Sequence, residues 1–289
     1  MKADLSVSLG DSLKLANPVG VASGTFGYGQ EYAELIDLGS LGALFTKAVT
    51  VEPRIGNRPP RLVETPMGLI NSIGLANPGV KVFIDEKLPY LRTLSCAVIV
   101  NIAGSTEDDY ARVVESIEGV PGGPGVAGYE VNVSCPNVRH GGMSFGTDPA
   151  TVERLTKNLR SRTTKPLIVK LSPNVTSIES IAAAAEFSGA DAVSCINTVV
   201  GMTIDIEAMV PTIGAGTGGL SGPAILPVGV AATWKVARAI KIPVIGIGGI
   251  RGPEDALQYL LAGASAVQIG TALFSDPKTP SKTIAGIAA

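Results

Sequence analysis

The stretch IPVIGIGGIRGPEDALQYLLAGASAVQIGTALF, residues 242–274, decides the fold that we expect for this chain. Val244–Ile247 and Ala266–Ile269 are short apolar runs without alternation, which is typical of parallel strands covered on both faces. Between them, Pro253–Ala262 opens with Pro and Glu and stops at Gly263, as a helix does. The stretch therefore predicts a strand–helix–strand unit.

The same alternation of apolar runs and helix-like segments recurs along the chain. Thr151–Arg162 follows Asp148-Pro149, and the alanine-rich Ser177–Ser188 ends at Gly189, so both are expected to be helices. Eight strands are expected, at Val19–Ser23, Ala43–Ala48, Ala97–Ile102, Tyr129–Ser134, Leu167–Leu171, Ala192–Asn197, Val244–Ile247 and Ala266–Ile269.

Eight strand–helix repeats predict an α/β fold, a (β/α)8 TIM barrel that forms a single domain over residues 1–289. A doubly wound open sheet is the alternative, and it is disfavoured because no GxGxxG follows the first strand. Residues 5–9 and 13–15 alternate apolar and polar side chains around a Gly10-Asp11 turn. This pattern predicts a β-hairpin, which we place at the barrel bottom.

Composition excludes several classes of protein. A net charge of −2 gives no electrostatic footprint for nucleic acid. No apolar run approaches the roughly 20 residues that span a bilayer, and the N-terminus lacks the apolar core of a signal peptide. The cysteines, Cys96, Cys135 and Cys195, are odd in number and widely spaced, so we expect no disulfides and a cytoplasmic location. With one histidine and no CxxC pair, no metal site is expected.

Two connections are too long for simple barrel loops. One runs from Thr50 to Leu94 and the other from Thr198 to Leu226. Both follow strands, so both belong to the C-terminal rim of the barrel, where active sites of this fold are built. Loops of this length in a compact domain are usually functional or disordered, and the density of Gly, Asn and apolar residues here favours function.

The last two expected strands carry a phosphate-binding signal. Gly248-Gly249 ends the seventh strand and Gly270-Thr271 ends the eighth. Glycine pairs let the backbone approach a ligand and offer N–H donors to phosphate oxygens, and these two loops are the usual phosphate site of such barrels. The glycines could instead simply end strands and cap helices. Both pairs together, in this order, favour phosphate binding.

Lys47 and Lys170 each lie within an apolar strand and are expected to point into or over the barrel mouth. Each could instead extend its ammonium group to solvent at the strand end. A buried ammonium needs an anionic partner, which a reduced cofactor or a substrate carboxylate would supply.

Asparagines also accumulate at the expected rim. A single Asn is more often a turn former than a ligand, but a cluster suits a planar heterocycle that has both amide N–H and C=O groups. The cluster comprises Asn71, Asn77, Asn101, Asn132, Asn137 and Asn197.

Residues 130–137, EVNVSCPN, carry an apolar strand directly into Cys135. A thiol in this position could be a general base or a nucleophile. A cysteine can also be a small buried hydrophobe, a role that fits Cys96 and Cys195 better. His140 lies five residues further on, so a Cys–His pair is conceivable, although a histidine in a surface loop is the commoner case.

The chain resembles the class 1 dihydroorotate dehydrogenases, most closely the class 1B catalytic subunit. The motifs that carry the resemblance cover nearly the whole chain, and EVNVSCPN together with NSIGLANPG (residues 71–79) is the most specific pair. The others include ANPVGVASGTFGYG, FTKAVT, VNIAGS, IVKLSPNV, CINTVVGM, GGLSGPAILP, IGIGGI and IGTALF.

The resemblance implies an FMN enzyme that oxidises (S)-dihydroorotate to orotate in pyrimidine biosynthesis. Cys135 would remove the C5 proton, and FMN N5 would accept the hydride from C6. Residues implied for substrate binding are Lys47, Asn71, Ser72, Ile73, Gly74, Leu75, Asn132, Asn197 and Thr198. Residues implied for FMN binding are Ser23, Lys47, Ala48, Asn101, Asn132, Lys170, Ile196, Gly222, Gly248, Gly249, Gly270 and Thr271.

The resemblance also bears on the electron acceptor. The base is a cysteine where class 2 has serine, and the N-terminus is a hairpin where class 2 has a helical extension for quinone. The segment VRHGGMSFG (residues 138–146) resembles class 1B, which passes electrons to NAD through a partner subunit carrying FAD and a [2Fe–2S] cluster. A homodimer is also implied.

Three alternatives are open. One is a class 1A enzyme that uses fumarate, because the lack of cluster cysteines in this chain fits both classes. Another is a non-flavin, phosphate-binding barrel isomerase or lyase that uses Lys170 as a base or Schiff-base amine. A non-catalytic scaffold is the third and is disfavoured, because the candidate rim residues are all in place.

Overall fold

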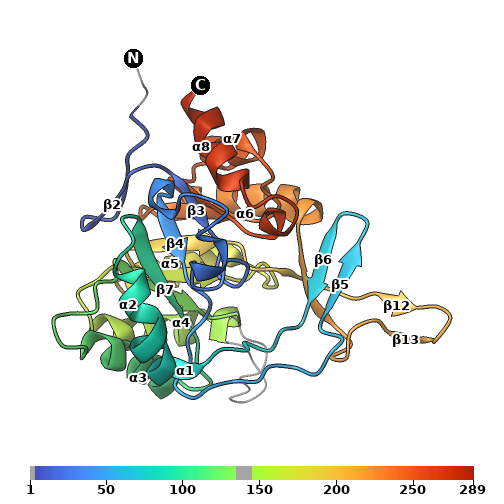
Figure 1. Cartoon of the computed structure of the whole chain (residues 1–289), viewed down its shortest axis with the longest axis horizontal. Helices are drawn as coiled ribbons and strands as arrows, with labels where there is room; N and C mark the ends of the chain where they lie inside the picture. Colours follow the sequence, from blue (N-terminus) through green and yellow to red (C-terminus); the bar gives the residue numbers. More distant parts are fainter. Residues whose placement is uncertain (1–3, 135–144) are drawn as a thin grey trace.

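The computed structural model describes residues 4–134 and 145–289 and shows a closed barrel of eight parallel strands (Figure 1). The first and last strands pair with each other, so the predicted (β/α)8 barrel is confirmed. In spatial order the strands are β3 (Val19–Val21), β4 (Ala43–Phe45), β7 (Ala97–Ile102), β8 (Gly128–Asn132), β9 (Leu167–Leu171), β10 (Ala192–Cys195), β15 (Val244–Ile247) and β16 (Ala266–Ile269).

Several strands end earlier than the apolar runs predicted. The chain leaves β3 after Val21 and β10 after Cys195, where the sequence pattern continued by two residues. Ser23 and Asn197 therefore lie beyond their strands, in the loops of the C-terminal rim. The apolar runs continue past the ends of these strands because the inner part of the rim is itself buried, as at Ala22 and Ile196.

Long helices cover the outside of the barrel. They are α3 (Glu107–Glu118), α4 (Pro149–Arg160), α5 (Ile178–Phe187), α6 (Leu226–Ala239), α7 (Pro253–Leu261) and α8 (Thr279–Ala288). The three that the sequence predicted are confirmed with ends shifted by one or two residues. Asp148 and Ser177 cap α4 and α5, each accepting a hydrogen bond from a backbone N–H three residues on.

The N-terminal hairpin closes the bottom of the barrel, as predicted. It consists of β1 (Val7–Leu9) and β2 (Leu13–Leu15). Leu9, Leu13 and Leu15 are buried in one cluster with inward-facing barrel residues such as Phe45 and Ile168. The lower interior is therefore filled by side chains, and any large cavity has to lie toward the other end.

The two long connections form an ordered sheet, where the sequence predicted loops. Strands β5 (Leu62–Thr65), β6 (Gly68–Asn71), β11 (Val199–Gly201) and β14 (Gly218–Ser221) make one antiparallel sheet, hereafter the rim sheet. The same connections contain α1 (Gly79–Val82), the π-helical turn η3 (Phe83–Lys87), α2 (Leu88–Leu91), β12 (Ile204–Asp205), β13 (Val210–Pro211) and η5 (Pro223–Ile225).

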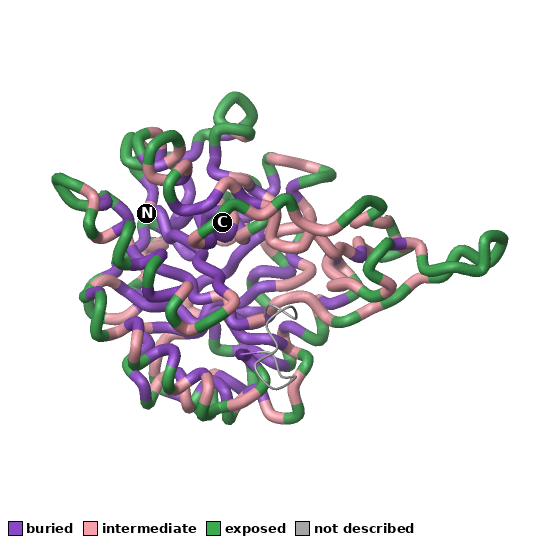
Figure 2. Tube along the Cα trace, turned by 90° about the horizontal axis from the view of Figure 1, so that it is seen from below, coloured by how far each residue is buried: buried purple, intermediate pink, exposed green. Residues whose placement is uncertain are grey.

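The β5–β6 and β12–β13 hairpins extend to one side of the barrel in Figure 1. Their outer parts are exposed, whereas purple buried chain is concentrated in the barrel (Figure 2). The remaining short 3-10 turns are η1 (Gln30–Tyr32), η2 (Leu38–Ser40), η4 (Phe145–Thr147) and η6 (Thr271–Phe274). Across the described ranges, no helix combines the length and apolar character needed to cross a bilayer.

Candidate active site

A cavity of about 1690 Å³ opens at the C-terminal ends of the barrel strands, beside the rim sheet. Its walls come from both long connections, from the loops after β15 and β16, and from the ends of β8 and β9. Ligand pockets commonly measure about 300–1,000 Å³. The cavity therefore has room for a cofactor and a small substrate together.

Most of the residues predicted for the site line this one cavity. Asn101 does not, because it lies fully buried within β7. Cys135, Asn137 and His140 lie outside the described residues. The lining residues are Ser23, Lys47, Ala48, Asn71, Ser72, Ile73, Gly74, Leu75, Asn132, Lys170, Ile196, Asn197, Thr198, Gly222, Gly248, Gly249, Gly270 and Thr271.

The glycine loops form one end of the cavity. Gly248 and Gly249 have φ angles of 128° and 73°, and a Cβ on Gly249 would lie 2.7 Å from the backbone nitrogen of Leu226. Within the described part of the chain, the N–H groups of these two glycines have no backbone or side-chain acceptor. Close backbone approach with unused donors suits a phosphate group.

A hydroxyl pair lies beside the glycine loops. Thr271 Oγ1 donates a hydrogen bond to Ser221 Oγ at 2.9 Å, so β14 of the rim sheet is tied to the loop after β16. Sequence reasoning missed Ser221. Its position directly before Gly222 was the available signal.

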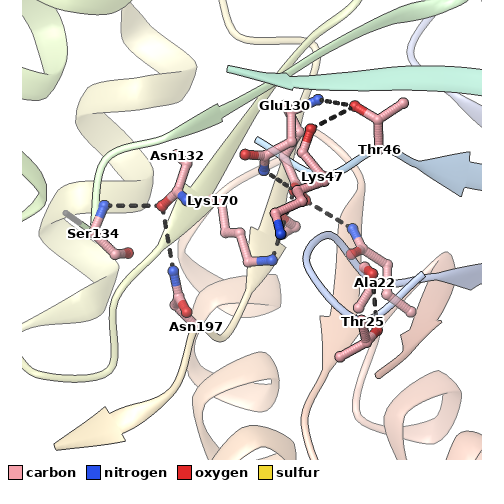
Figure 3. A network of polar contacts seen from close by, with 12 residues as sticks. Ala22, Thr25, Thr46, Lys47, Glu130, Asn132, Ser134, Lys170 and Asn197 are labelled. Carbon is pink, nitrogen blue, oxygen red and sulfur yellow. Dashed lines mark hydrogen bonds and ion pairs between the residues drawn. The ribbon is translucent and has the colours of Figure 1, made fainter. Parts of the chain in front are cut away.

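Asparagines form the polar wall at the end of β8 (Figure 3). Asn132 Oδ1 accepts hydrogen bonds from Asn197 Nδ2 and from the backbone N–H of Ser134, both at 3.3 Å. Asn197 Oδ1 in turn accepts from the Thr198 N–H at 2.8 Å. These bonds fix the orientation of the Asn132 and Asn197 side-chain amides, both of which line the cavity.

Asn77, another asparagine of the expected cluster, has a structural role. It is buried, and its amide bonds the Thr50 hydroxyl, the Leu75 carbonyl and the Gly79 N–H. Its side-chain amide is therefore fully used in hydrogen bonds that hold the turn after β6. For this residue the turn-former interpretation is correct.

The two lysines meet the cavity in different environments. Burial, followed by the nearby positive charge of Arg61, lowers the pKa of Lys47 from its usual value. An anionic ligand would reverse this effect. Lys170 is only 5% exposed and comes within 3.6 Å of a carboxylate oxygen of Glu130.

Glu130 belongs to a polar layer inside the barrel, of which sequence reasoning singled out Asn101 and Lys170 and missed Glu130, Ser194 and Gln268. We define the polar layer as Asn101, Glu130, Lys170, Ser194 and Gln268, and Figure 3 shows part of it. The signal was present in the strand, since an acidic residue stands two positions before Asn132 and so faces the same side. In an otherwise apolar strand, such a residue points to a buried polar network.

The fold and the position of the cavity are those of a TIM-barrel enzyme, with glycine loops and an asparagine wall lining the cavity at the C-terminal rim. Comparison with known proteins makes the assignment specific. The family model described as "Dihydroorotate dehydrogenase" matches residues 6–289, and the chain belongs to this family. It is therefore an oxidoreductase, in agreement with the resemblance seen in its motifs.

Similarity to curated relatives identifies the subclass within this family. The chain is 53% identical over 284 residues to "Dihydroorotate dehydrogenase B (NAD(+)), catalytic subunit" of Geotalea uraniireducens (strain Rf4), covering 98% of this chain and 92% of the relative. The protein of the same name from Trichlorobacter lovleyi is 51% identical over 287 residues, covering 99% and 93%. The class 1B prediction is confirmed, and the class 1A and isomerase or lyase alternatives are not supported.

A solved structure agrees with the fold. A dihydroorotate dehydrogenase from Eimeria tenella, crystallised in complex with ferulenol, superposes with a TM-score of 0.81 at 22% sequence identity. The match covers 98% of this chain and 83% of that chain. At this identity the similarity bears on the barrel alone.

Proposed function

We propose that this chain oxidises (S)-dihydroorotate to orotate with FMN bound in the rim cavity, the whole chain acting as one cytoplasmic domain. The carrying observation is the cavity itself. It is lined by a glycine loop whose N–H groups have no acceptor among the described residues, by the hydrogen-bonded pair Asn132–Asn197, and by Lys170. The curated relatives, at about half identity, are named catalytic subunits of such enzymes.

The residues present fit FMN. The phosphate would lie on the N–H groups of Gly248, Gly249, Gly270 and Thr271, where a Cβ on Gly249 would crowd the backbone. Ser23, Ala48, Ile196 and Gly222 would line the rest of the cofactor site, with Lys170 near the ring. When bound, FMN supplies at N5 the acceptor for the hydride that leaves C6 of dihydroorotate. Asn101 would contribute from beneath the cavity.

The polar wall fits the substrate. Dihydroorotate presents amide N–H and C=O groups around a ring, and Asn71, Asn132, Asn197 and Thr198 offer both donors and acceptors. Its carboxylate would lie near Lys47, whose ammonium is disfavoured by burial until an anion arrives. The segment Ser72–Leu75 would complete this side.

We assign the general base to Cys135. Asn132 and Ser134 line the cavity, and Cys135 is the next residue in the chain. A thiolate there would take the C5 proton as the hydride leaves C6, so that two hydrogens depart and orotate remains. The neighbouring amides would hold the ring in place for this transfer.

Electrons would then leave through a partner. The curated relatives are named NAD(+) enzymes and catalytic subunits. We therefore propose that this chain forms a homodimer, and that the homodimer binds an electron-transfer subunit carrying FAD and a [2Fe–2S] cluster. Co-purification from native expression is expected to yield that subunit together with NAD-dependent turnover. Turnover with fumarate by the isolated chain, and no partner, would contradict this part.

The chemistry is tested on the purified chain. We expect a yellow protein whose flavin absorbance bleaches anaerobically when dihydroorotate is added. Cys135→Ala is expected to bind orotate but to reduce the flavin about 10²–10⁴-fold more slowly, because a general base contributes about that factor. Cys96→Ala, a buried cysteine before β7, is the matched control with a normal rate. A colourless protein that takes up no FMN would contradict the proposal. A near-normal rate of flavin reduction in Cys135→Ala would show that the general base is a residue other than Cys135.

A further inference from the structure

We infer that Glu130 is a positioning residue for the flavin reaction, acting through Lys170: its carboxylate keeps the Lys170 ammonium charged at the cavity floor. The inference rests on the FMN site proposed above. It concerns the polar layer, to which neither the resemblance nor the relatives assign a role for Glu130.

Glu130 has the hydrogen-bond environment of an ionised carboxylate. Its side chain is fully buried, and three neutral groups donate to it. Asn101 Nδ2 lies 2.5 Å from Oε2, while Ser194 Oγ and Gln268 Nε2 each lie 2.8 Å from Oε1. The donors come from three other strands, β7, β10 and β16, so residues of four barrel strands meet at this one carboxyl group. A carboxylate that accepts several such bonds is favoured in its charged form.

Lys170 stands between this charge and the cavity. Lys170 in β9 pairs in register with Asn132 in β8, two residues beyond Glu130 toward the C-terminal end of that strand. Its side chain lines the cavity and is only 5% exposed. Its Nζ lies 3.6 Å from Glu130 Oε2. Among the described residues no other side chain is bonded to this ammonium, so its remaining N–H groups are available to a ligand.

The other charges around the cavity do not replace Glu130. Besides Lys170, the charged groups in the described lining are Lys47, Arg61, Glu64, Arg251 and Asp276. Lys47 and Arg61 are cations and disfavour a further positive charge. No described carboxylate other than Glu130 lies within 4 Å of Lys170 Nζ. A buried ammonium without a partner releases its proton instead of staying charged.

The pair therefore controls proton uptake during reduction. With Lys170 charged beforehand, reduction of bound FMN by two electrons would take up one proton, because the Lys170 ammonium would supply the balancing positive charge. Without Glu130, Lys170 would be a neutral amine while FMN is oxidised. Reduction by two electrons would then take up two protons, one on the flavin and one on Lys170.

Glu130→Gln is a usable test because the polar layer can accept a neutral side chain. Asn101 Oδ1 and Gln268 Oε1 are buried acceptors without a partner in the described part of the chain. Rotation of either amide would present an acceptor to the new Gln N–H group, so the added donor would find a partner. Glu118→Gln is the matched control, since Glu118 accepts from Tyr129 OH and the Thr163 hydroxyl, outside the polar layer.

The experiment measures the FMN midpoint potential between pH 6 and 9 on the FMN-loaded chain. In the wild type and in Glu118→Gln, we expect a slope of about 30 mV per pH unit, one proton for two electrons. In Glu130→Gln, the slope is expected to double to about 59 mV per pH unit at the alkaline end. Lys170→Met is expected to abolish the effect, so that adding Glu130→Gln to it leaves the slope unchanged.

The outcomes separate this inference from the proposed function. A wild-type chain that binds no FMN defeats the proposed function, and the inference with it. A folded, FMN-loaded Glu130→Gln variant with the wild-type slope overturns the inference alone, even if its potential is shifted uniformly. If Glu130→Gln does not fold, Glu130→Ala, which also removes the carboxylate, must show the steeper alkaline slope, and a wild-type slope there overturns the inference equally.

Discussion

Asn71 in β6 and Gly219 in β14 lie opposite each other in the rim sheet, although 148 positions separate them in the sequence. Asn71 Nδ2 donates to the Gly219 carbonyl at 3.2 Å. The pairing joins the two long connections into one wall of the cavity. It also brings Asn71 and Thr198, two residues predicted for the substrate, to the same wall, because a Cβ on Gly219 would overlap the Thr198 side chain.

Substitution at this contact tests the substrate wall. Gly219→Ala is expected to displace Thr198 and to weaken orotate binding about tenfold or more, the equivalent of one lost hydrogen bond of about 1.4 kcal/mol. FMN content should be retained. Gly201→Ala is the control in the same sheet, because its Cβ would lie 3.4 Å from Leu220 Cβ. Orotate titration followed by flavin absorbance distinguishes the two variants, and equal affinities would remove Thr198 from the site.

The glycine loop after β15 gives a prediction about the cofactor. Gly249→Ala combines a left-handed backbone with a Cβ only 2.7 Å from the Leu226 nitrogen, and such strain costs about 1–3 kcal/mol. We expect loss of bound FMN and a lower melting temperature. Gly252→Ala is the control, since Gly252 has an extended backbone and space for a Cβ. FMN content per chain is the measurement, and full occupancy of the Gly249→Ala variant would contradict the phosphate assignment.

The cysteines should differ in reactivity. Burial raises the pKa of the Cys96 thiol to about 11 and that of Cys195 to about 12. A raised pKa lowers the thiolate fraction, so at pH 8 about one part in a thousand or less of either thiol is reactive. We expect iodoacetamide at pH 8 to alkylate Cys135 first, and orotate to protect it. Peptide mass spectrometry measures this, and rapid labelling of Cys195 would contradict the burial described here.

The hairpin at the barrel bottom should matter for stability and not for catalysis. Leu9→Ala removes a side chain that is 1% exposed, and such truncations cost about 2–5 kcal/mol. Lys14→Ala, on the exposed side of the same hairpin, is the control with little effect. Denaturant unfolding measures the difference. The rate of flavin reduction per folded molecule should be unchanged in both variants, and a large loss of rate in Leu9→Ala would couple the hairpin to the site.

Local sequence patterns predicted the barrel strands and several of the helices around them. The apolar runs located all eight barrel strands, because strands buried on both faces need uninterrupted apolar residues. The caps Asp148 and Ser177 located two helix starts, because their side chains satisfy N–H groups within the same short segment. The rim sheet could not be predicted in this way. Its strands pair across the two long connections, and short stretches such as residues 199–201 carry little periodicity of their own.

The sequence by itself determined the barrel, the plugging hairpin, the family and a set of site residues of which most line the cavity. These follow from local periodicity and from motifs contiguous in the chain. Only the tertiary structure decided that Asn77 serves a turn, that Asn101 lies in the barrel interior, and that Glu130 stands beside Lys170. Each of these depends on which groups of distant strands meet when the barrel closes, and a hydrogen bond or charge pair exists only once both partners are in place.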